Sequence, residues 1–219
     1  YFVLEHVEGL QIDEYCDVNN LPIIERIKIF RKVCAAVQYA HQNLIVHRDI
    51  KPSNILVGEN GEPKLLDFGI AKMLNPELFN VTLATGPEVR LMTPEYASPE
   101  QVQGQPISTA SDVYALGVLL YELMTGRRPY QIRSRLQQEI VRIICEVEPE
   151  KPSTAITQAH DVITRDGVRT VTPEEVAKKR AGDLDKLRKG LRGDIDNILL
   201  KALQKAPRRR YSSAEQFAE

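Results

Sequence analysis

Long hydrophobic runs are missing from this chain of 219 residues. A membrane-spanning helix needs about 20 predominantly apolar residues, and the most apolar stretch, residues 112–124, is shorter than that. The chain also lacks a charged leader followed by a short apolar core. The sequence therefore predicts a cytoplasmic segment without membrane contact, and a membrane anchor elsewhere in a longer parent protein is compatible with it.

Cysteine is scarce as well. The three cysteines, Cys16, Cys34 and Cys145, are widely spaced and form no Cys-x-x-Cys pair. This spacing argues against a zinc site or a dithiol redox centre, and it is typical of a reducing compartment. Cys34 lies on the apolar side of a helical pattern and is expected to be buried, whereas an exposed position is open to Cys16, beside which nothing argues for a reactive thiolate.

The chain has little excess charge of either sign. Its 29 basic and 30 acidic residues leave a net charge of -1, so the overall charge does not favour nucleic acid or an anionic membrane as partner. With 42% hydrophobic residues, the composition is typical of a globular domain with a substantial core. Basic residues gather in residues 178–192, where a solvated helix face is favoured over a docking surface for an acidic partner.

The residues that carry chemistry begin at residues 47–54, His-Arg-Asp-Ile-Lys-Pro-Ser-Asn. An apolar strand at 55–57, a polar turn and a second strand at 64–66 follow, and Asp67 comes directly after the second strand. Two strands joined by a short polar turn predict a hairpin. We expect this hairpin to bring the residues before its first strand close to Asp67.

These residue types suit phosphoryl transfer, in which the protein mainly positions the reactants and stabilises charge. Magnesium prefers oxygen ligands, which the carboxylate of Asp67 and the amide of Asn54 supply. Asp49 then remains as the base that accepts a proton from the attacking hydroxyl. Lys51 places an ammonium where negative charge develops on the transferred phosphate.

Four motifs that follow one another along the chain resemble those of protein kinases. In that family they are the catalytic loop, the metal loop, the end of the activation segment and the start of a buried central helix. Lys51 indicates a serine/threonine kinase, and Ser98-Pro99-Glu100-Gln101 resembles bacterial members of the family. The motifs are His47-Arg48-Asp49 with Lys51 and Asn54, Asp67-Phe68-Gly69, Thr93-Pro94-Glu95-Tyr96-Ala97-Ser98-Pro99-Glu100, and Asp112-Val113-Tyr114-Ala115-Leu116-Gly117.

The resemblance implies a mainly α fold, α+β overall, like the C-lobe of a protein kinase. Its features would be a small β-hairpin with the catalytic and metal loops and a buried helix over 112–124, capped by Asp112 and ended by Gly126. Residues 1–219 would then form a partial catalytic domain. Residues 1–9 would be the end of the N-lobe and the hinge, and residues 10–219 a C-lobe that is cut within its last helix.

The same resemblance implies where ATP binds. Backbone groups of Glu5 and Val7 in the hinge would hold adenine, Leu56 would form the floor beneath it, and Leu4 would be the gatekeeper. The glycine-rich loop, the strand lysine and its glutamate partner would all lie upstream of Tyr1. The 219-residue piece alone is therefore expected to bind ATP poorly and to be inactive.

Hydrophobic periodicity and capping signals predict the remaining elements. Amphipathic helices are expected over 22–42 and 134–147, a strand over 44–46, and a polar, irregular surface insertion over 148–170. Thr172 opens a capping box with proline at the first helical position, and a basic helix should follow it. A core helix over 195–203 should end near Pro207, and Ser212 with Glu215 should cap the last helix.

Several residues of the motifs have competing interpretations. His47 follows an apolar stretch, so a packed core residue is favoured over a base or metal ligand. Arg48 would clamp a phosphorylated Thr82 or Thr85, and a plain ion pair to a carboxylate is the alternative. For Asp112, a structural bond to the backbone near His47 and Arg48 is favoured over catalysis. The resemblance also pairs Glu100 with Arg210 and places Thr93 against Asp49 and Lys51.

The leading hypothesis is a magnesium-dependent serine/threonine protein kinase that transfers the γ-phosphate of ATP to protein hydroxyls. A pseudokinase scaffold is the alternative, and the presence of Asp49, Lys51, Asn54 and Asp67 argues against it. A small-molecule phosphotransferase would not explain residues 93–100. The sequence does not identify the protein substrate, or which of several threonines is the activating phosphosite; the candidates are Thr82, Thr85 and Thr93.

Overall fold

The computed structural model describes residues 6–67, 94–132, 136–164, 167–180 and 182–219. In these ranges the chain is mostly helical and contains a three-stranded and a two-stranded antiparallel sheet. This confirms the predicted mainly helical, α+β fold. Within the described ranges, no helix combines the length and the hydropathy needed to span a bilayer.

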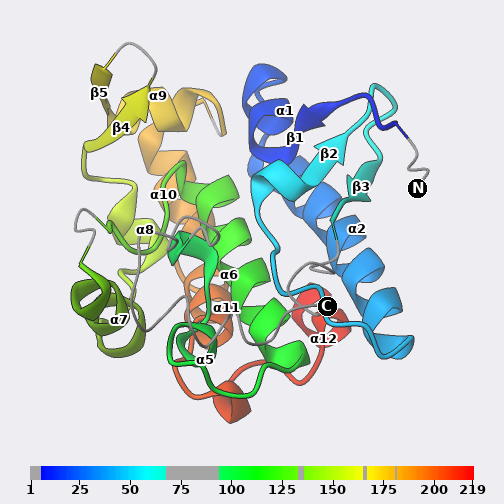
Figure 1. Ribbon diagram of the computed structural model, residues 1–219. Helices are drawn as coiled ribbons and strands as arrows, with labels where there is room; N and C mark the ends of the chain where they lie inside the picture. Colours follow the sequence, from blue (N-terminus) through cyan, green and yellow to red (C-terminus); the bar gives the residue numbers. More distant parts are fainter. Residues whose placement is uncertain (1–5, 68–93, 133–135, 165–166, 181) are drawn as a thin grey trace.

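The elements follow the order drawn in Figure 1. The helices are α1 (Ile12–Val18), α2 (Ile23–Gln42), α5 (Pro99–Val102), α6 (Thr109–Thr125), α7 (Gln137–Glu146), α8 (Pro152–Ala155), α9 (Pro173–Lys178), α10 (Leu184–Leu191), α11 (Asp194–Ala202) and α12 (Ala214–Ala218), with 3-10 turns η1 (Pro52–Asn54), η3 (Pro94–Tyr96) and η4 (Pro207–Arg209). The strands are β1 (Leu10–Gln11), β2 (Ile55–Val57), β3 (Pro63–Leu65), β4 (His160–Thr164) and β5 (Gly167–Val171).

Helix α6 is the core of the molecule, and Figure 1 shows it passing between α2 and α11, both of which it contacts. Every residue from 111 to 121 is buried. Gly126 ends the helix in a left-handed conformation, with φ of 73°, as predicted. The prediction that Asp112 is the N-cap was wrong, because the helix begins at Thr109 and the Ser108 hydroxyl accepts the Ala110 N–H at 3.3 Å.

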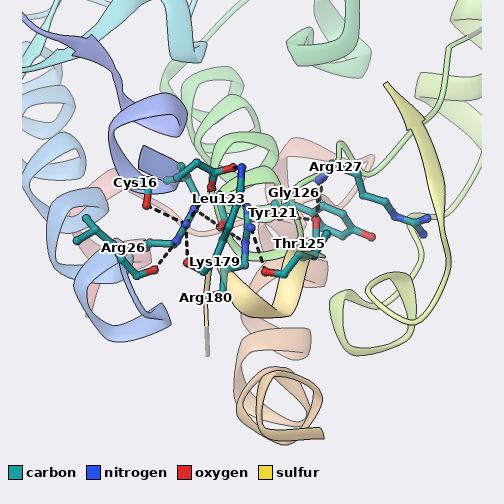
Figure 2. A network of polar contacts seen from close by, with 12 residues as sticks. Cys16, Arg26, Tyr121, Leu123, Thr125, Gly126, Arg127, Lys179 and Arg180 are labelled. Atoms are coloured by element: carbon teal, nitrogen blue, oxygen red, sulfur yellow. Dashed lines mark hydrogen bonds and ion pairs between the residues drawn. The ribbon is translucent and has the colours of Figure 1, made fainter. Parts of the chain in front are cut away.

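Two buried arginines bind the last turn of α6, as Figure 2 shows. The Leu123 carbonyl accepts Nη1 of Arg26 at 3.2 Å and Nε of Arg180 at 3.0 Å. Cations at this end of a helix interact favourably with its dipole. Asp17 pairs with Arg26 at 2.9 Å and with Arg180 at 3.4 Å. Burial lowers the pKa of Arg180 to about 10, and this residue therefore does not belong to the solvated basic face predicted for residues 178–192.

Helix α2 confirms the amphipathic prediction to within one residue. The strand predicted over 44–46 does not form, however, and these residues make a turn and an irregular connection. Leu44 has φ of 61° and is 94% exposed, so it occupies the left-handed position after a helix that glycine usually takes. Its apolar character suggested a strand, but the reversal of the chain after α2 determines its conformation.

The predicted hairpin is present, with β3 one residue earlier than expected. Leu56 pairs with Lys64 in antiparallel register. Strand β1, which the sequence analysis did not predict, extends the sheet by pairing Gln11 with Leu56. A Cβ at Gly9 would lie 2.6 Å from the Val57 carbonyl oxygen, so only glycine permits this close approach.

The prediction of an irregular insertion over 148–170 was wrong. This region contains α8 and the hairpin of β4 and β5, in which Thr170 donates to Asp161 across the strands at 2.8 Å. His160 lies 3.3 Å from the Gly126 carbonyl and attaches the hairpin to the end of α6. Much of the hairpin faces solvent; Val168, for example, is 70% exposed. The sequence analysis missed the hairpin because strands with little burial do not show an alternation of apolar and polar residues.

The capping box at Thr172 is confirmed, and α9 begins directly after it. The single basic helix expected there is divided into α9 and α10, since Asp183 caps a second start by accepting the Lys186 N–H at 2.8 Å. The last helix is capped by Ser213 rather than by Ser212. Two further helices differ slightly from the prediction. Helix α7 covers Gln137–Glu146 where 134–147 was predicted, and α11 covers Asp194–Ala202 where 195–203 was predicted.

Cys34 is fully buried, as predicted. Cys16 is buried too, and burial raises its pKa to about 11. Both thiols are therefore protonated near neutral pH and act as small apolar side chains.

A buried ion pair joins α5 to the segment after η4, as the resemblance implied. Arg210 binds both carboxylate oxygens of Glu100, at 2.7 Å and 2.8 Å, and Ser111 donates to the same carboxylate at 2.7 Å. Burial of Glu100 opposes ionisation, but the hydrogen bonds from Arg210 and Ser111 outweigh it and lower its pKa. The pair therefore acts as an ionised, bidentate link within the core.

We predict that Leu44→Gly raises the free energy of unfolding by about 0.5 to 1 kcal/mol, because glycine adopts a positive φ without steric cost. The exposed leucine side chain contributes no burial that could be lost. Urea denaturation measures the change. Val18→Gly is the matched control, since Val18 is 63% exposed and is not among the residues with positive φ, and it should destabilise the protein. Destabilisation by Leu44→Gly would contradict the prediction.

We predict that Glu100→Gln lowers the free energy of unfolding by about 3 kcal/mol at neutral pH, because it leaves the charge of Arg210 buried without its partner. The native pKa of Glu100 is lowered, so its stabilisation is present above the unfolded-state pKa and is lost as the pH falls through the native value. Urea denaturation over a pH series should show the difference from wild type shrinking on acidification.

The control for this experiment is Glu139→Gln, which removes a carboxylate from an exposed pair with Arg142. Its effect should be much smaller than that of Glu100→Gln, because solvent screens an exposed ion pair. Equal changes in the free energy of unfolding for the two variants would contradict the prediction that the buried pair at Glu100 stabilises the fold more than an exposed pair does.

Candidate active site

The backbone of residues 47–54, between α2 and β2, is held by a carboxylate from α6. Asp112 accepts the backbone N–H of His47 and that of Arg48, both at 2.8 Å. It also lies 2.8 Å from Nε2 of His41, and only 1% of Asp112 is exposed. All these contacts are structural, which confirms the predicted role of Asp112.

His47 is fully buried, as predicted. Its Nε2 lies 2.9 Å from the carbonyl oxygen of Leu66, which can only accept, so this nitrogen carries the proton. Nδ1 is then the acceptor for the backbone N–H of Asp49 at 3.3 Å. The neutral ring therefore joins the segment before β2 to the end of β3.

Two residues of the site have a backbone conformation that is rare for residues other than glycine. Arg48 has φ of 68° and Asp67 has φ of 50°. Strained conformations of this kind persist where the surrounding contacts require them, often at functional sites. For Arg48 these contacts include Gln101, whose side-chain amide donates to its carbonyl at 2.9 Å.

The predicted phosphate clamp at Arg48 stays a prediction. Its Nε is buried without a hydrogen-bond partner in the part of the chain that the structure describes. The proposed acceptors, Thr82 and Thr85, lie outside the described residues, as does Thr93.

Three of the predicted site residues converge. Nζ of Lys51 lies 2.9 Å from Oδ2 of Asp49. The side-chain amide of Asn54 donates to the same Oδ2 at 3.0 Å and to the backbone carbonyl of Asp49 at 2.8 Å. The side chains of Asp49 and Lys51 are 24% and 20% exposed, so a substrate can reach them. A carboxylate and an ammonium thus face a common, accessible space.

Asp67 lies at the same end of the hairpin. The backbone N–H of the preceding residue, Leu66, donates to the Asn54 carbonyl at 2.8 Å, just beyond the paired residues of β2 and β3. The Asp67 side chain is exposed. The chain therefore brings Asp67 next to Asn54, although 12 residues separate them in the sequence.

The donors at this end fit a magnesium ion. Asn54 uses its amide nitrogen on Asp49, which leaves its amide oxygen, a hard donor, for a ligand. Asp67 adds an exposed carboxylate. No group of three His, Cys, Asp or Glu residues suited to a metal occurs among the described residues. Asn54 and Asp67 would thus supply two oxygen donors, and magnesium usually keeps several water ligands.

The residues predicted to hold adenine are described in part. Leu56 lies in the middle strand of the sheet and is half-buried. Val7 is half-buried and precedes β1, the strand that pairs with β2. Glu5 lies outside the described residues, as does Leu4.

A small cavity opens beside Asp49, and the sequence analysis assigned no role to most of the residues around it. Tyr96 lines this cavity, and its hydroxyl donates to Glu122 of α6. Periodicity could not reveal this arrangement, because the lining comes from three separate segments. The lining residues are Arg48, Asp49, Ile50, Tyr96, Ala97, Gln101 and Ala115.

Comparisons with known proteins identify the family of this chain. A sequence profile of the protein kinase domain matches residues 1–219. The chain is 34% identical over 217 residues to the serine/threonine-protein kinase PrkC of Bacillus subtilis, and the match covers 98% of this chain and 27% of PrkC. It is 32% identical over 219 residues to PknB of Mycolicibacterium smegmatis, covering 99% of this chain and 29% of that protein.

The fold is also similar to a solved structure, the kinase domain of PknI from Mycobacterium tuberculosis, with a TM-score of 0.56 and 24% sequence identity. That match covers 98% of this chain and 61% of the PknI chain. The chain thus spans less than a third of the curated relatives named above. Since the kinase profile covers its whole length, the chain belongs to the protein kinase domain family, with bacterial serine/threonine kinases among its relatives.

Proposed function

We propose that the complete protein transfers the γ-phosphate of ATP to serine or threonine hydroxyls of other proteins in a magnesium-dependent reaction. The observation that supports this proposal best is the convergence of Asp49, Lys51 and Asn54 at an accessible site with Asp67 next to it. Phosphoryl transfer needs this combination of a base, a cation and hard oxygen donors. The names of the relatives, serine/threonine-protein kinases, support the substrate class.

In the proposed reaction, the acceptor hydroxyl lies within hydrogen-bond reach of Asp49. Its oxygen forms a bond to the γ-phosphorus while the bond from that phosphorus to the bridging oxygen of ADP breaks, and the hydroxyl proton passes to Asp49. The ammonium of Lys51, 2.9 Å from Asp49, faces the same space and stabilises the charge on the transferred group.

Asn54 and Asp67 would hold magnesium through an amide oxygen and a carboxylate. When bound, the metal neutralises charge on the phosphates and orients them. The contact from Asn54 to Asp49 has a further consequence, since it holds the base and a metal ligand at a fixed spacing. Val7, Glu5 and Leu56 would contact the adenine as the resemblance implies, with residues 1–9 as hinge and residues 10–219 as the C-lobe.

A pseudokinase scaffold is the alternative function. The contacts at the site argue against it, because the side chains of Lys51 and Asn54 are both ordered on the carboxylate of Asp49. A scaffold without catalysis has no need for this arrangement.

We predict that Asp67→Asn lowers kcat for peptide phosphorylation by at least about 100-fold, because an amide in place of the carboxylate removes the charge that holds the metal. The complete protein is assayed with a serine or threonine peptide, ATP and magnesium. Thermal unfolding provides a second readout, since stabilisation by ATP with magnesium, relative to ATP with EDTA, should be lost in the variant.

The matched control is Asp185→Asn, which removes an exposed carboxylate on α10 and should change neither readout. Full activity of Asp67→Asn in the magnesium-dependent assay would refute the proposed site. Absence of phosphorylation by the wild-type protein, together with ATP binding, would favour the scaffold.

A further inference from the structure

A cluster of charged residues beside the cavity at Asp49 has no part in the proposed chemistry. Arg128 follows the end of α6, and its Nη1 lies 3.3 Å from Glu95. Its Nε lies 3.5 Å from Glu122 in the last turn of α6. The guanidinium carbon also lies 5.1 Å from the ring centroid of Tyr96, a cation–π contact. One guanidinium is thus held by two carboxylates and an aromatic ring.

This cluster is close to the place where an acceptor peptide must lie. Tyr96 lines the cavity that also contains Asp49, and Glu95 is its neighbour in η3. The side chains of Arg128 and Glu95 are 38% and 25% exposed, so the cluster is open to solvent and to a ligand. Because Tyr96 and Asp49 line the same cavity, a peptide with its hydroxyl at Asp49 would have this surface within reach of residues near the acceptor.

Without Arg128, the cluster would be an acidic pocket. Glu95 and Glu122 each contribute a carboxylate, and Asp13 on α1 adds negative charge near Glu122. The Glu122 side chain is only 16% exposed, and this burial raises its pKa. Two carboxylates beside a tyrosine ring form the environment that a guanidinium or ammonium group of a ligand prefers.

We infer that Arg128 is an internal cation that occupies this acidic pocket and thereby excludes arginine and lysine side chains of acceptor peptides. This inference rests on the proposed function and names the class of substrate. The acceptor segments would be neutral or acidic where they cross η3. Specificity of this kind comes from a repulsive element, since a ligand cation would meet the charge of Arg128 and would have to displace it.

The inference is tested with the complete protein and a set of peptides that share one serine acceptor. In each peptide, one glutamine within four residues of the acceptor is replaced by arginine. We expect the wild-type protein to show no preference for arginine at any position. In Arg128→Gln, the ratio of kcat/KM for the arginine peptide to that for the glutamine peptide should rise about fivefold at one or two positions, the upper range for a partly exposed ion pair.

Arg142→Ala is the matched control, because it also removes one arginine from a pair with glutamate, but on the exposed surface of α7. It should leave the ratio unchanged. Adding Glu122→Gln to Arg128→Gln should abolish the gain, which a general loss of folding would not reproduce. Arg128→Lys, which keeps the positive charge, should also show no gain.

Two results would overturn the inference while leaving the proposed function intact. One is a wild-type protein that already prefers arginine near the acceptor, which needs no variant to be detected. The other is an unchanged ratio in Arg128→Gln while the glutamine peptide is still phosphorylated. If the wild-type protein phosphorylates none of the peptides and no other protein hydroxyl, the proposed function fails, and this inference fails with it.

Discussion

The active-site segment depends on one buried carboxylate. Asp112, in the first turn of α6, accepts the backbone N–H groups of His47 and Arg48, both at 2.8 Å. An unpaired carboxylate in this position would be costly, so the loop and the helix stabilise each other. Because α6 is packed in the core, Asp112 has a fixed position, and its hydrogen bonds fix the backbone of His47 and Arg48. This link allows Arg48 to keep a left-handed backbone conformation.

A second connection joins this loop to the hairpin. His47 binds the carbonyl of Leu66 through one ring nitrogen and the N–H of Asp49 through the other, so the proposed base and the residue before Asp67 share one support. Asn54 completes the arrangement by bonding to Asp49 with its amide nitrogen. Reactive side chains on rigid supports lose little entropy when a substrate binds, which is the main contribution a protein makes to phosphoryl transfer.

Predictions from the sequence succeeded where a local signal and tertiary packing agree. Helix α2, the hairpin of β2 and β3, and the capping box at Thr172 were found because periodicity, turn residues and caps act over a few residues. The predictions failed where tertiary structure overrides the local preference of a residue. Leu44 is apolar but lies in an exposed left-handed turn, and β4 and β5 form a hairpin that is largely exposed.

The sequence by itself determined the residue types of the site and their order along the chain, because the chemistry of a base, a cation and metal ligands dictates those side chains. Only the tertiary structure decided that Ser108 rather than Asp112 caps α6, which frees Asp112 to bind the loop. It also decided that Arg128 lies between Glu95 and Glu122. The contacts of Asp112 with His47 and of Arg128 with Glu95 join segments that are far apart in the sequence. A local sequence pattern does not specify which polar group a buried charge contacts.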